Sequence, residues 1–254
     1  MSLEPDTSPG ALVITGGTRG IGASIAIAAA AHQHPLALIY RSREAEAHAL
    51  AQRLRGQGSK VALYQADVGD GAQVRAVFGE IAREFGAVHG LVNNAGTTGG
   101  RATLDELHEQ QLDQVFRTNV QGAFLCAQQA ARLMPRAGTN RGGAIVNVSS
   151  SASQLGAPGV WVHYAASKAA LEAMSAGLAK ELAPAGIRVN VVRCGVIDTE
   201  VHAGHGMQRL EQLLFRIPMG RMGQAGEVAS AVNWLLSPQA SYVTGTVIDV
   251  AGGL

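Results

Sequence analysis

Hydrophobic positions along the chain gather in short runs of four or five residues, and longer stretches with apolar residues at helical spacing separate these runs. Runs rich in branched apolar residues are typical of strands that are buried on both faces of a parallel sheet. The runs that predict strands are residues 11–15, 36–40, 61–65, 89–92 and 144–148. The stretches that predict helices are residues 23–31, 44–55, 74–81 and 112–134. Strands that alternate with helices in this order indicate an α/β fold.

The longest of these helical stretches carries a polar interruption. Its apolar positions predict a stripe that faces inward, formed by Leu112, Val115, Phe116, Val120, Ala123 and Phe124. Asn119 falls within this stripe, and a buried amide is costly unless its polar groups are paired. Asn119 therefore either makes a structural hydrogen bond or belongs to a site, and both interpretations remain open at this point.

A glycine-rich turn follows the first predicted strand directly. The residues are Gly16-Gly-Thr-Arg-Gly20-Ile-Gly22, and an Ala/Ile-rich helix comes next. Absent side chains allow a ligand to approach closely, and free N–H groups at a helix start attract anions, so this arrangement suits a phosphate. The spacing is not Gly-x-Gly-x-x-Gly, and no Lys-Ser/Thr follows as in a P-loop. The alternative is that the glycines serve only a tight turn and helix packing.

Basic residues follow the second predicted strand. An NAD-binding unit usually places an acidic residue here for the ribose 2′-hydroxyl, whereas this chain has Arg41-Ser-Arg43. Arg41 and Arg19 of the glycine turn predict a site for a 2′-phosphate, which guanidinium groups bind well. The alternative is that both are ordinary surface arginines. After the third strand, Asp67 is expected to meet an adenine edge and Asp70 to cap the next helix.

The segment from Ser149 to Lys168 carries the candidate chemistry. Tyr164 and Lys168 are four residues apart, which places them on one face of a helix. A phenol titrates near ~10, and an ammonium ~4 Å away stabilises the phenolate, so the pair suits proton transfer between a carbonyl and an alcohol. Three serines, 149–151, end the fifth strand, where open parallel sheets place ligands. On an ordinary helix, however, such a Tyr–Lys pair is structural or solvated.

Composition narrows the class of protein. The chain has 254 residues, 47% of them apolar, with a net charge of +1 and scattered basic residues, which suits a single domain and argues against nucleic acid or a membrane surface as partner. Cys126 and Cys194 lack metal-ligand spacing, which fits a reducing cytoplasm. Residues 1–10 are expected to form a flexible tail without signal-peptide character, and no apolar run reaches ~18 residues.

Several ordered motifs together resemble the short-chain dehydrogenase/reductase family over residues 11–253. The matching elements are TGGTRGIG at 15–22, Asp67, NNAG at 93–96, Asn119, the serine cluster, Tyr164-x-x-x-Lys168, a segment similar to the Pro-Gly motif at 194–195, and the TGT and IDVAGG segments within 244–253. The resemblance implies a doubly wound, Rossmann-type parallel sheet of about seven strands with helices on both faces. It also implies one NAD(P)-binding catalytic domain over residues 11–254 with a substrate lid around 198–217, and assembly into a homotetramer or homodimer through the long helices.

The same resemblance assigns catalytic roles. Tyr164 is the general acid of carbonyl reduction, and Lys168 lowers its pKa and holds the nicotinamide ribose. Asn119 supports a water that links Lys168 to solvent. Ser150 is the serine expected to polarise the substrate oxygen, because alignment on Gly156 selects it and the strand 144–148 should fix its geometry better than a loop can, whereas counting back from Tyr164 favours Ser151. Ser149 and Ser153 are expected to be turn or surface hydroxyls.

The family also implies a set of cofactor contacts. Cys194 stands where the family normally has proline, and the absence of proline is expected to loosen this loop. Trp161, Val162 and His163 are expected to line the pocket or to pack on a neighbour, and His202 and His205 lack the partners of a metal site. The expected cofactor-binding residues are Gly16, Thr18, Arg19, Gly20, Ile21, Tyr40, Arg41, Ser42, Asp67, Val68, Asn94, Ala95, Gly96, Tyr164, Lys168, Gly195, Val196 and Thr199.

These expectations lead to one principal hypothesis for function. The chain is an NADP(H)-dependent oxidoreductase that interconverts a carbonyl, in a ketone or a 3-oxoacyl-type substrate, with a secondary alcohol. One alternative is a sugar or polyol dehydrogenase of the same family, with which the loop carrying Trp161 and His163 is compatible. A second alternative is a non-catalytic NADP(H)-binding regulator or scaffold.

Overall fold

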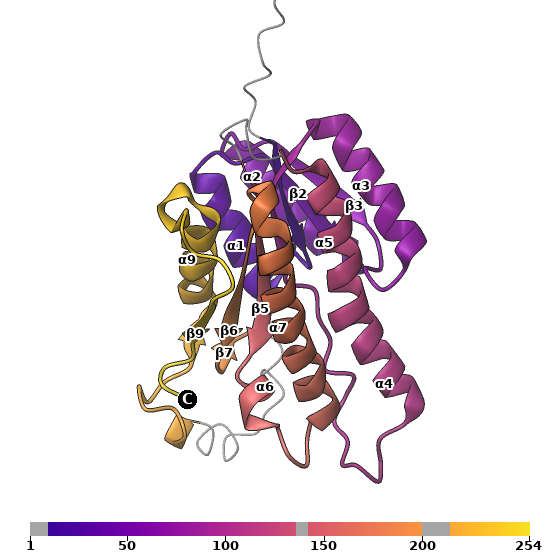
Figure 1. The fold of residues 1–254 in the computed structure, drawn as a ribbon, viewed down its shortest axis with the longest axis vertical. Coiled ribbons are helices and arrows are strands. Elements are labelled where there is room, and N and C mark those ends of the chain that lie inside the picture. The colour runs from indigo at the N-terminus through magenta and orange to yellow at the C-terminus, as the bar shows by residue number, and fades with distance from the viewer. Residues whose placement is uncertain (1–9, 136–141, 200–213) are drawn as a thin grey trace, which may run out of the picture.

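The strands form one parallel sheet at the centre of the molecule. The computed structural model describes residues 10–135, 142–199 and 214–254. Within these residues, seven parallel strands are arranged in the order β3-β2-β1-β4-β5-β6-β9 (Figure 1). They are β1 (Ala11–Thr15), β2 (Leu36–Tyr40), β3 (Val61–Gln65), β4 (Val88–Asn93), β5 (Ala144–Ser150), β6 (Arg188–Cys194) and β9 (Val247–Val250). The order reverses between β1 and β4, which confirms the doubly wound, Rossmann-type fold.

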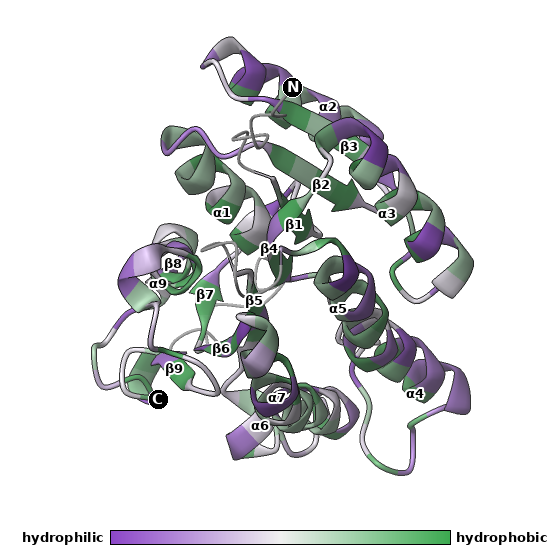
Figure 2. Ribbon diagram, turned by 45° about the horizontal axis from the view of Figure 1, so that its top comes forward, coloured by the Kyte–Doolittle hydropathy of each residue, from purple (hydrophilic) through white to green (hydrophobic). Residues whose placement is uncertain are grey.

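Helices cover both faces of this sheet. One face carries α1 (Gly20–Ala31), α2 (Glu44–Gly56) and α9 (Ala225–Leu236), and the other carries α3 (Gly71–Phe85), α4 (Glu109–Phe116), α5 (Gly122–Leu133) and α7 (Val162–Leu182). Each face has its own apolar core, and strands β2 and β3 are mostly hydrophobic in Figure 2. All five residues of β1 are buried, as expected for a strand covered on both sides. The shorter elements are α6 (Ala152–Leu155), β7 (Ile197–Asp198), β8 (Gly223–Gln224) and the 3₁₀ turns Ala183–Ala185 and Pro238–Ala240.

The predicted cap at Asp70 is confirmed. Its carboxylate accepts hydrogen bonds from the backbone N–H groups of Ala72 at 2.8 Å and Gln73 at 3.2 Å. These bonds satisfy the first orphan donors of α3 and lower the pKa of Asp70. The cap of α3 is therefore Asp70 and not Asp67, which lies at the carboxyl edge of the sheet, two residues after β3.

The stretch 112–134 is helical, as predicted, but it is not a regular α-helix throughout. A π-helix, η1 (Arg117–Gln121), separates α4 from α5, and the Gly122 N–H donates to the Arg117 carbonyl oxygen. The buried row of side chains is Val115, Asn119 and Ala123. Leu112, Phe116 and Phe124 were expected to face inward, but they form the neighbouring row and are exposed, Phe124 by 47%. Sequence spacing alone does not tell which of two adjacent rows on a helix meets the sheet.

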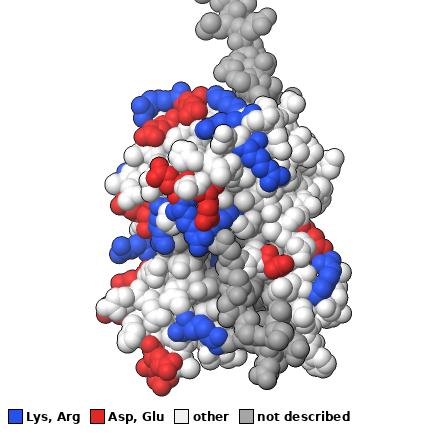
Figure 3. All heavy atoms as spheres, turned by 180° about the vertical axis from the view of Figure 1, so that it is seen from behind, with Lys and Arg blue, Asp and Glu red and all other residues white. Residues whose placement is uncertain are grey.

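The surface has no extended field of one sign on the face seen in Figure 3. Positive and negative side chains are interspersed there. None of the helices in the described part of the chain is long and apolar enough to cross a membrane.

Candidate active site

The glycine turn between β1 and α1 is shaped by its lack of side chains. Gly16 and Gly20 have φ angles of +61° and +52°, a region that other residues rarely adopt. An added Cβ at Gly22 would lie 2.1 Å from the Gly16 carbonyl oxygen, so only glycine fits there. The Asn94 amide donates to the Thr15 and Gly16 carbonyl oxygens at 3.1 and 3.0 Å. Turn geometry and helix packing therefore explain these glycines in part, and they also keep the turn free of side chains.

A cleft opens beside this turn, over the point where the strand order reverses. It encloses about 630 Å³, including the space at its mouth. The predicted cofactor residues that line it are Gly16, Thr18, Arg19, Tyr40, Arg41, Ser42, Asp67, Val68, Ala95 and Gly96. Four lining residues were not predicted from the sequence: Ile39, Ala66, Thr97 and Thr118. Ile39, Ala66 and Thr97 lie next to predicted residues in the chain. They could have been predicted by including every residue near the carboxyl ends of the predicted strands.

Two arginines from different elements face this cleft. Arg19 directly precedes α1, and Arg41 directly follows β2. The Arg41 guanidinium lies 3.9 Å from the Asp67 carboxylate, and both side chains are largely exposed, so this is a weak surface pair. Arg43 instead pairs with Glu46 at 2.9 Å and does not line the cleft. The arginines at 19 and 41 thus meet at one cleft, as the sequence led us to expect.

The remaining predicted cofactor residues lie around the cleft without lining it. Thr199 lies close to the glycine turn, because an added Cβ at Gly20 would be 3.8 Å from its methyl group. Gly195 packs against the backbone of Ala251, and Cys194 is the last residue of β6. The strand is regular up to Cys194, and the loop that was expected to be loosened begins after it. The others are Gly20, Ile21, Asn94 and Val196.

Tyr164, Lys168 and Ser150 come together at the carboxyl end of β5. The helix α7 places Lys168 Nζ 5.8 Å from the centre of the Tyr164 ring. The Ser150 hydroxyl shares a hydrogen bond with the Tyr164 phenol. Ser151 is buried at the start of α6, and its backbone N–H donates to the Cys194 carbonyl oxygen at 2.7 Å. Of the two candidate serines, Ser150 is therefore the one bonded to the tyrosine.

The expected lowering of the Tyr164 pKa by Lys168 is not found in this structure. Burial raises the pKa of Tyr164 to about 12, and the hydrogen bond with Ser150 opposes this shift. Burial also lowers the pKa of Lys168 to about 8, against the attraction of Cys194 and Glu172. The Lys168 ammonium donates to the Val148 carbonyl oxygen at 2.7 Å. Desolvation is therefore the largest influence on the pKa of Tyr164.

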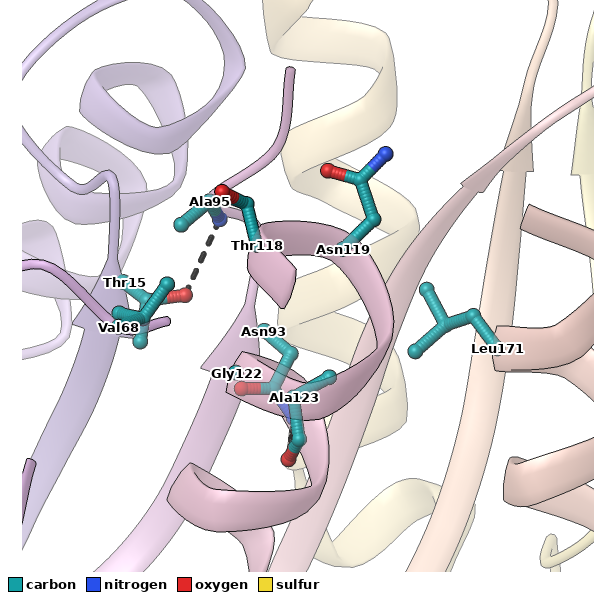
Figure 4. A pocket seen from close by; sticks show the side chains of 9 residues that line it. All are labelled: Thr15, Val68, Asn93, Ala95, Thr118, Asn119, Gly122, Ala123 and Leu171. Atoms are coloured by element: carbon teal, nitrogen blue, oxygen red, sulfur yellow. Dashed lines mark hydrogen bonds between the residues drawn. The ribbon is translucent and has the colours of Figure 1, made fainter. Parts of the chain in front are cut away.

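Asn119 satisfies its buried amide completely. Its Oδ1 accepts from the Thr97 N–H at 2.8 Å, and its Nδ2 donates to the Thr97 carbonyl oxygen and to Ser167 Oγ, both at 2.9 Å. An added Cβ at Gly96 would lie 3.4 Å from Asn119 Oδ1 and 3.5 Å from Lys168 Nζ. The Asn119 amide thus makes structural hydrogen bonds and also borders the site. Both interpretations that the sequence left open therefore apply to this residue. Figure 4 shows Asn119 on the wall of a small pocket beside the ends of β1 and β4.

His163 packs on the loop that follows β4. It is buried, and its Nε2 lies 2.8 Å from the Thr98 carbonyl oxygen, to which it donates. The Gln111 amide donates to the Gly99 carbonyl oxygen at 3.0 Å in the same loop. Trp161 makes an edge contact with Tyr164, the ring centres being 6.5 Å apart, whereas Val162 is exposed. Of these residues, Trp161 is the one beside the tyrosine.

The expectation of a turn or surface hydroxyl is wrong for the buried Ser149, whereas Ser153 makes a turn contact with the Ser150 carbonyl oxygen at 2.8 Å. Ser149 is 2% exposed, and both hydroxyls lie 2.6 Å from the Glu172 carboxylate. The same carboxylate pairs with Arg193 at 2.7 Å. Sequence reasoning missed Glu172 and Arg193 altogether. The one signal was the spacing of four residues between Lys168 and Glu172, which places both on one helix face.

Part of the predicted site falls outside the described residues. The expected lid, 198–217, is described only at its two ends, and His202 and His205 lie outside the described part. Among the described residues, no group of three or more His, Cys, Asp or Glu side chains is arranged to hold a metal ion.

A glycine-lined cleft at the reversal of a doubly wound sheet, beside a Ser–Tyr–Lys group, defines a nucleotide-binding oxidoreductase. A family model described as Enoyl-(Acyl carrier protein) reductase matches residues 16–254. The chain belongs to the short-chain dehydrogenase/reductase family and is an oxidoreductase of that family.

Relatives of the chain match it over nearly its whole length. It is 45% identical to the uncharacterized oxidoreductase YgfF of Escherichia coli K12 over 242 residues, which are 95% of this chain and 98% of that protein. It is 37% identical to the 3-oxoacyl-[acyl-carrier-protein] reductase FabG of Staphylococcus aureus Mu50, over 95% and 96% of the two chains. The crystal structure of a short-chain dehydrogenase from Burkholderia cenocepacia J2315 in complex with NADP superimposes with a TM-score of 0.89, at 33% identity, over 96% of this chain and 97% of that one.

Proposed function

We propose that this protein is an NADP(H)-dependent oxidoreductase that interconverts a ketone or 3-oxoacyl-type carbonyl with a secondary alcohol. The observation that carries the proposal is the hydrogen bond between Ser150 and Tyr164, with Lys168 one turn further along the same helix. These are a hydroxyl to orient a carbonyl oxygen, a phenol to give it a proton, and a cation to steady the phenolate that results. The group stands beside a cleft suited to a dinucleotide.

The residues of the cleft fit this cofactor. The glycine turn is a cradle that added side chains would fill, and the first N–H groups of α1 lack partners within the helix. Arg19 and Arg41 at the mouth favour a 2′-phosphate, and the related Burkholderia enzyme is in complex with NADP. Asp67 and Val68 would meet the adenine, and Lys168 the nicotinamide ribose. When bound, the cofactor supplies or accepts the hydride.

The chain's own residues then manage the proton. Because burial holds the pKa of Tyr164 at about 12, the phenol is protonated at neutral pH, which is the form that donates to a carbonyl oxygen in reduction. Ser150 would hold the substrate oxygen within reach of that phenol. Asn119, bonded to Thr97 and Ser167, would hold the loop after β4 against α7 and support a water that leads from Lys168 to solvent.

The proposed substrate class rests on the relatives. A protein that is 37% identical over its length is a 3-oxoacyl-[acyl-carrier-protein] reductase. The sugar or polyol alternative relied partly on His163, whose Nε2 is already bonded to Thr98. The non-catalytic alternative is disfavoured because the serine, tyrosine and lysine are all present and held at one strand end. Both cysteines are buried and unpaired, which favours a reducing compartment such as the cytoplasm.

The test is a turnover screen with purified protein. Acetoacetyl-coenzyme A, simple ketones and sugars are each offered with NADPH or NADH, or with the oxidised forms for alcohols, and the absorbance of the reduced nicotinamide is followed. We expect turnover of a ketone or 3-oxoacyl thioester with NADPH, and its loss by about 10²-fold or more in Tyr164→Phe with NADPH binding retained. Turnover of sugars alone, or an undiminished rate in Tyr164→Phe, would contradict the proposal.

We also propose that the chain forms a homotetramer or homodimer through its long helices. Leu112, Phe116 and Phe124 form an exposed apolar row on α4 and α5. The exposed residues in the middle of α7 are small, namely Ala166, Ala169, Ala173, Ala176 and Gly177, and Lys180 and Glu181 follow them at the C-terminal end of the helix. Apolar rows of this kind need a covering surface, and a second copy supplies one. Phe116→Glu should shift the mass measured by light scattering toward the monomer, and an unchanged mass would exclude this face.

A further inference from the structure

A row of polar side chains crosses three strands at the carboxyl end of the sheet. Ser149 of β5 is in register with Arg193 of β6, and Arg193 is in register with Asp249 of β9. Residues in register on neighbouring strands point to the same face of a sheet. This face is the one that α7 covers, and Glu172 of α7 reaches all of the row except Asp249.

The Glu172 carboxylate is held by three side chains. Its Oε1 lies 2.6 Å from Ser149 Oγ, 2.6 Å from Ser153 Oγ and 3.0 Å from Arg193 Nε. Its Oε2 accepts from Arg193 Nη2 at 2.7 Å. Arg193 Nη1 in turn donates to Asp249 at 2.9 Å. The Glu172 and Arg193 side chains are only 15% and 9% exposed, so this is a largely buried ion pair with a planar, two-point contact.

The bonds to Glu172 keep it ionised. Burial alone would raise the pKa of this carboxyl, but the hydrogen bonds from Arg193, Ser149 and Ser153 bring it below its ordinary value. A buried ion pair usually adds little net stability, and its better-attested use is to specify one arrangement of the chain. The question is which arrangement this pair specifies.

The residue enclosed by these contacts is Ser150. Ser149, which precedes it, is bonded to Glu172, and the Ser153 hydroxyl lies 2.8 Å from the Ser150 carbonyl oxygen as well as 2.6 Å from Glu172. The single proton of the Ser153 hydroxyl serves one of these two acceptors at a time, and when it is donated to Glu172, the residues on both sides of Ser150 are tied to α7. Tyr164, Lys168 and Glu172 follow one another at intervals of four residues on that helix, so one face carries the phenol, the ammonium and the anchor.

We propose that Glu172 is a positioning residue, which holds the Ser150 hydroxyl against the Tyr164 phenol by tying Ser149 and Ser153 to α7. Arg193 fixes the carboxylate from the side of β6. For its effect on turnover the inference rests on the proposed function, whereas the positioning itself is a property of the protein alone. A displacement of about 1 Å in a reacting group is enough to cost on the order of 10²-fold in rate.

The test removes the two hydroxyl anchors and leaves the ion pair intact. In the double variant Ser149→Ala/Ser153→Ala, the Glu172–Arg193 pair remains, so no buried charge loses its partner. The control is Ser175→Ala, which removes a hydroxyl of α7 that is as buried as that of Ser149 and is bonded to Asn147 and Leu171. The third variant is Glu172→Gln, which keeps the shape of the side chain and removes its charge. If Glu172→Gln does not fold, the serine double variant alone tests the proposal.

The first readout is the NMR signal of Tyr164 in protein labelled at the tyrosine ζ carbon. The chain has four tyrosines, and Tyr164→Phe identifies the signal. We expect the serine double variant and Glu172→Gln to shift this signal in the same direction as Ser150→Ala, and Ser175→Ala to leave it in place. A Tyr164 signal that does not move in the double variant overturns the positioning role, whatever the turnover.

The second readout is turnover of acetoacetyl-coenzyme A with NADPH. We expect kcat to fall by about tenfold or more in the double variant, with the Kd for NADPH within about twofold of wild type. Ser175→Ala should keep kcat even if its Tm falls. A double variant with full kcat also overturns the proposal. Wild-type protein that shows no turnover of any carbonyl, but in which the Tyr164 signal responds as expected, defeats the proposed function and upholds the positioning of Ser150.

Discussion

The Lys168 ammonium donates a 2.7 Å hydrogen bond to the Val148 carbonyl oxygen, near the end of β5. The same ammonium lies 5.8 Å from the centre of the Tyr164 ring. A single side chain therefore joins α7 to the strand that carries the serine cluster. Since Lys168 is buried, its protonation affects the stability of the fold as well as the chemistry of the site.

Stability should consequently depend on pH through Lys168. Burial lowers its pKa to about 8, whereas an unfolded lysine titrates near ~10.4. Between these values the unfolded chain binds more protons, so stability rises with pH. Below pH ~8 the lysine is charged in both the folded and the unfolded state, and the full cost of burying the charge lowers the free energy of unfolding. We expect wild type to gain on the order of 2 kcal/mol from this residue between pH 7 and pH 10, measured by urea unfolding.

The comparison protein for this measurement is Lys168→Met. The Cys126 and Cys194 thiols, whose pKa values burial raises to about 12, act in the opposite direction as the pH rises. Their main shift comes from burial and is common to both proteins, so the difference between the two reports chiefly on the lysine and its attraction to Cys194. A difference in unfolding free energy that stays constant from pH 7 to pH 10 would contradict the buried, charged state of Lys168.

Cofactor preference should depend on Arg41. A hydrogen bond to a charged group contributes ~1.5–3 kcal/mol, so Arg41→Gln should weaken NADPH binding by roughly 10- to 100-fold and leave NADH binding nearly unchanged. The control is Arg43→Gln, since Arg43 pairs with Glu46 and does not line the cleft. Both affinities are measured by fluorescence titration. Wild-type protein that binds NADH as tightly as NADPH would exclude the phosphate site.

The two candidate serines should differ in their effect on the rate. Ser150 is bonded to the Tyr164 phenol, so Ser150→Ala should lower kcat by about tenfold or more at unchanged NADPH affinity. Ser151 contributes a backbone N–H to the Cys194 carbonyl oxygen, and substitution leaves this bond in place. Ser151→Ala should therefore change kcat by less than about threefold. The reverse order of effects would transfer the role to Ser151.

Two glycines of the site should respond differently to a methyl group. Gly96→Ala places its Cβ 3.4 Å from Asn119 Oδ1 and 3.5 Å from Lys168 Nζ, so the protein should fold normally but lose NADPH affinity, because the methyl group enters the cleft. Gly22→Ala brings its Cβ to 2.1 Å from the Gly16 carbonyl oxygen, which forces the backbone to move. We expect a loss of ~1–3 kcal/mol or more in Gly22→Ala by thermal unfolding. Equal melting temperatures of the two variants would contradict this assignment.

The five strands predicted from apolar runs are all present, because a strand covered on both faces has nowhere to place polar side chains. Strand β6 was not predicted, and its polar residues Asn190 and Arg193 explain why. Asn190 donates to the Val243 carbonyl oxygen, and Arg193 bonds Glu172. Such partners come from distant parts of the chain, so a local pattern does not reveal that these side chains are buried.

The same limit applies to the site. Glycine turns and the Tyr164–Lys168 spacing are local, and they were recognised from the sequence. The π-helix around Asn119 was not, because it is set by the contacts of Asn119 with Thr97 and Ser167. The pKa of Tyr164 was expected to fall because the expectation considered the Lys168 ammonium and left out the burial of the phenol. Desolvation depends on the whole fold and is the larger effect here.

The arginines at the mouth of the cleft and the Ser–Tyr–Lys group lie on opposite sides of the point where the strand order reverses. Arg19 precedes α1 and Arg41 follows β2, whereas Ser150 belongs to β5 and Tyr164 and Lys168 belong to α7. Changes in sites without shared partners combine almost additively. If the arginines hold the coenzyme phosphate as proposed, selection or engineering could exchange one coenzyme for another without retuning the reaction, and new substrates could be acquired while the same nucleotide is kept.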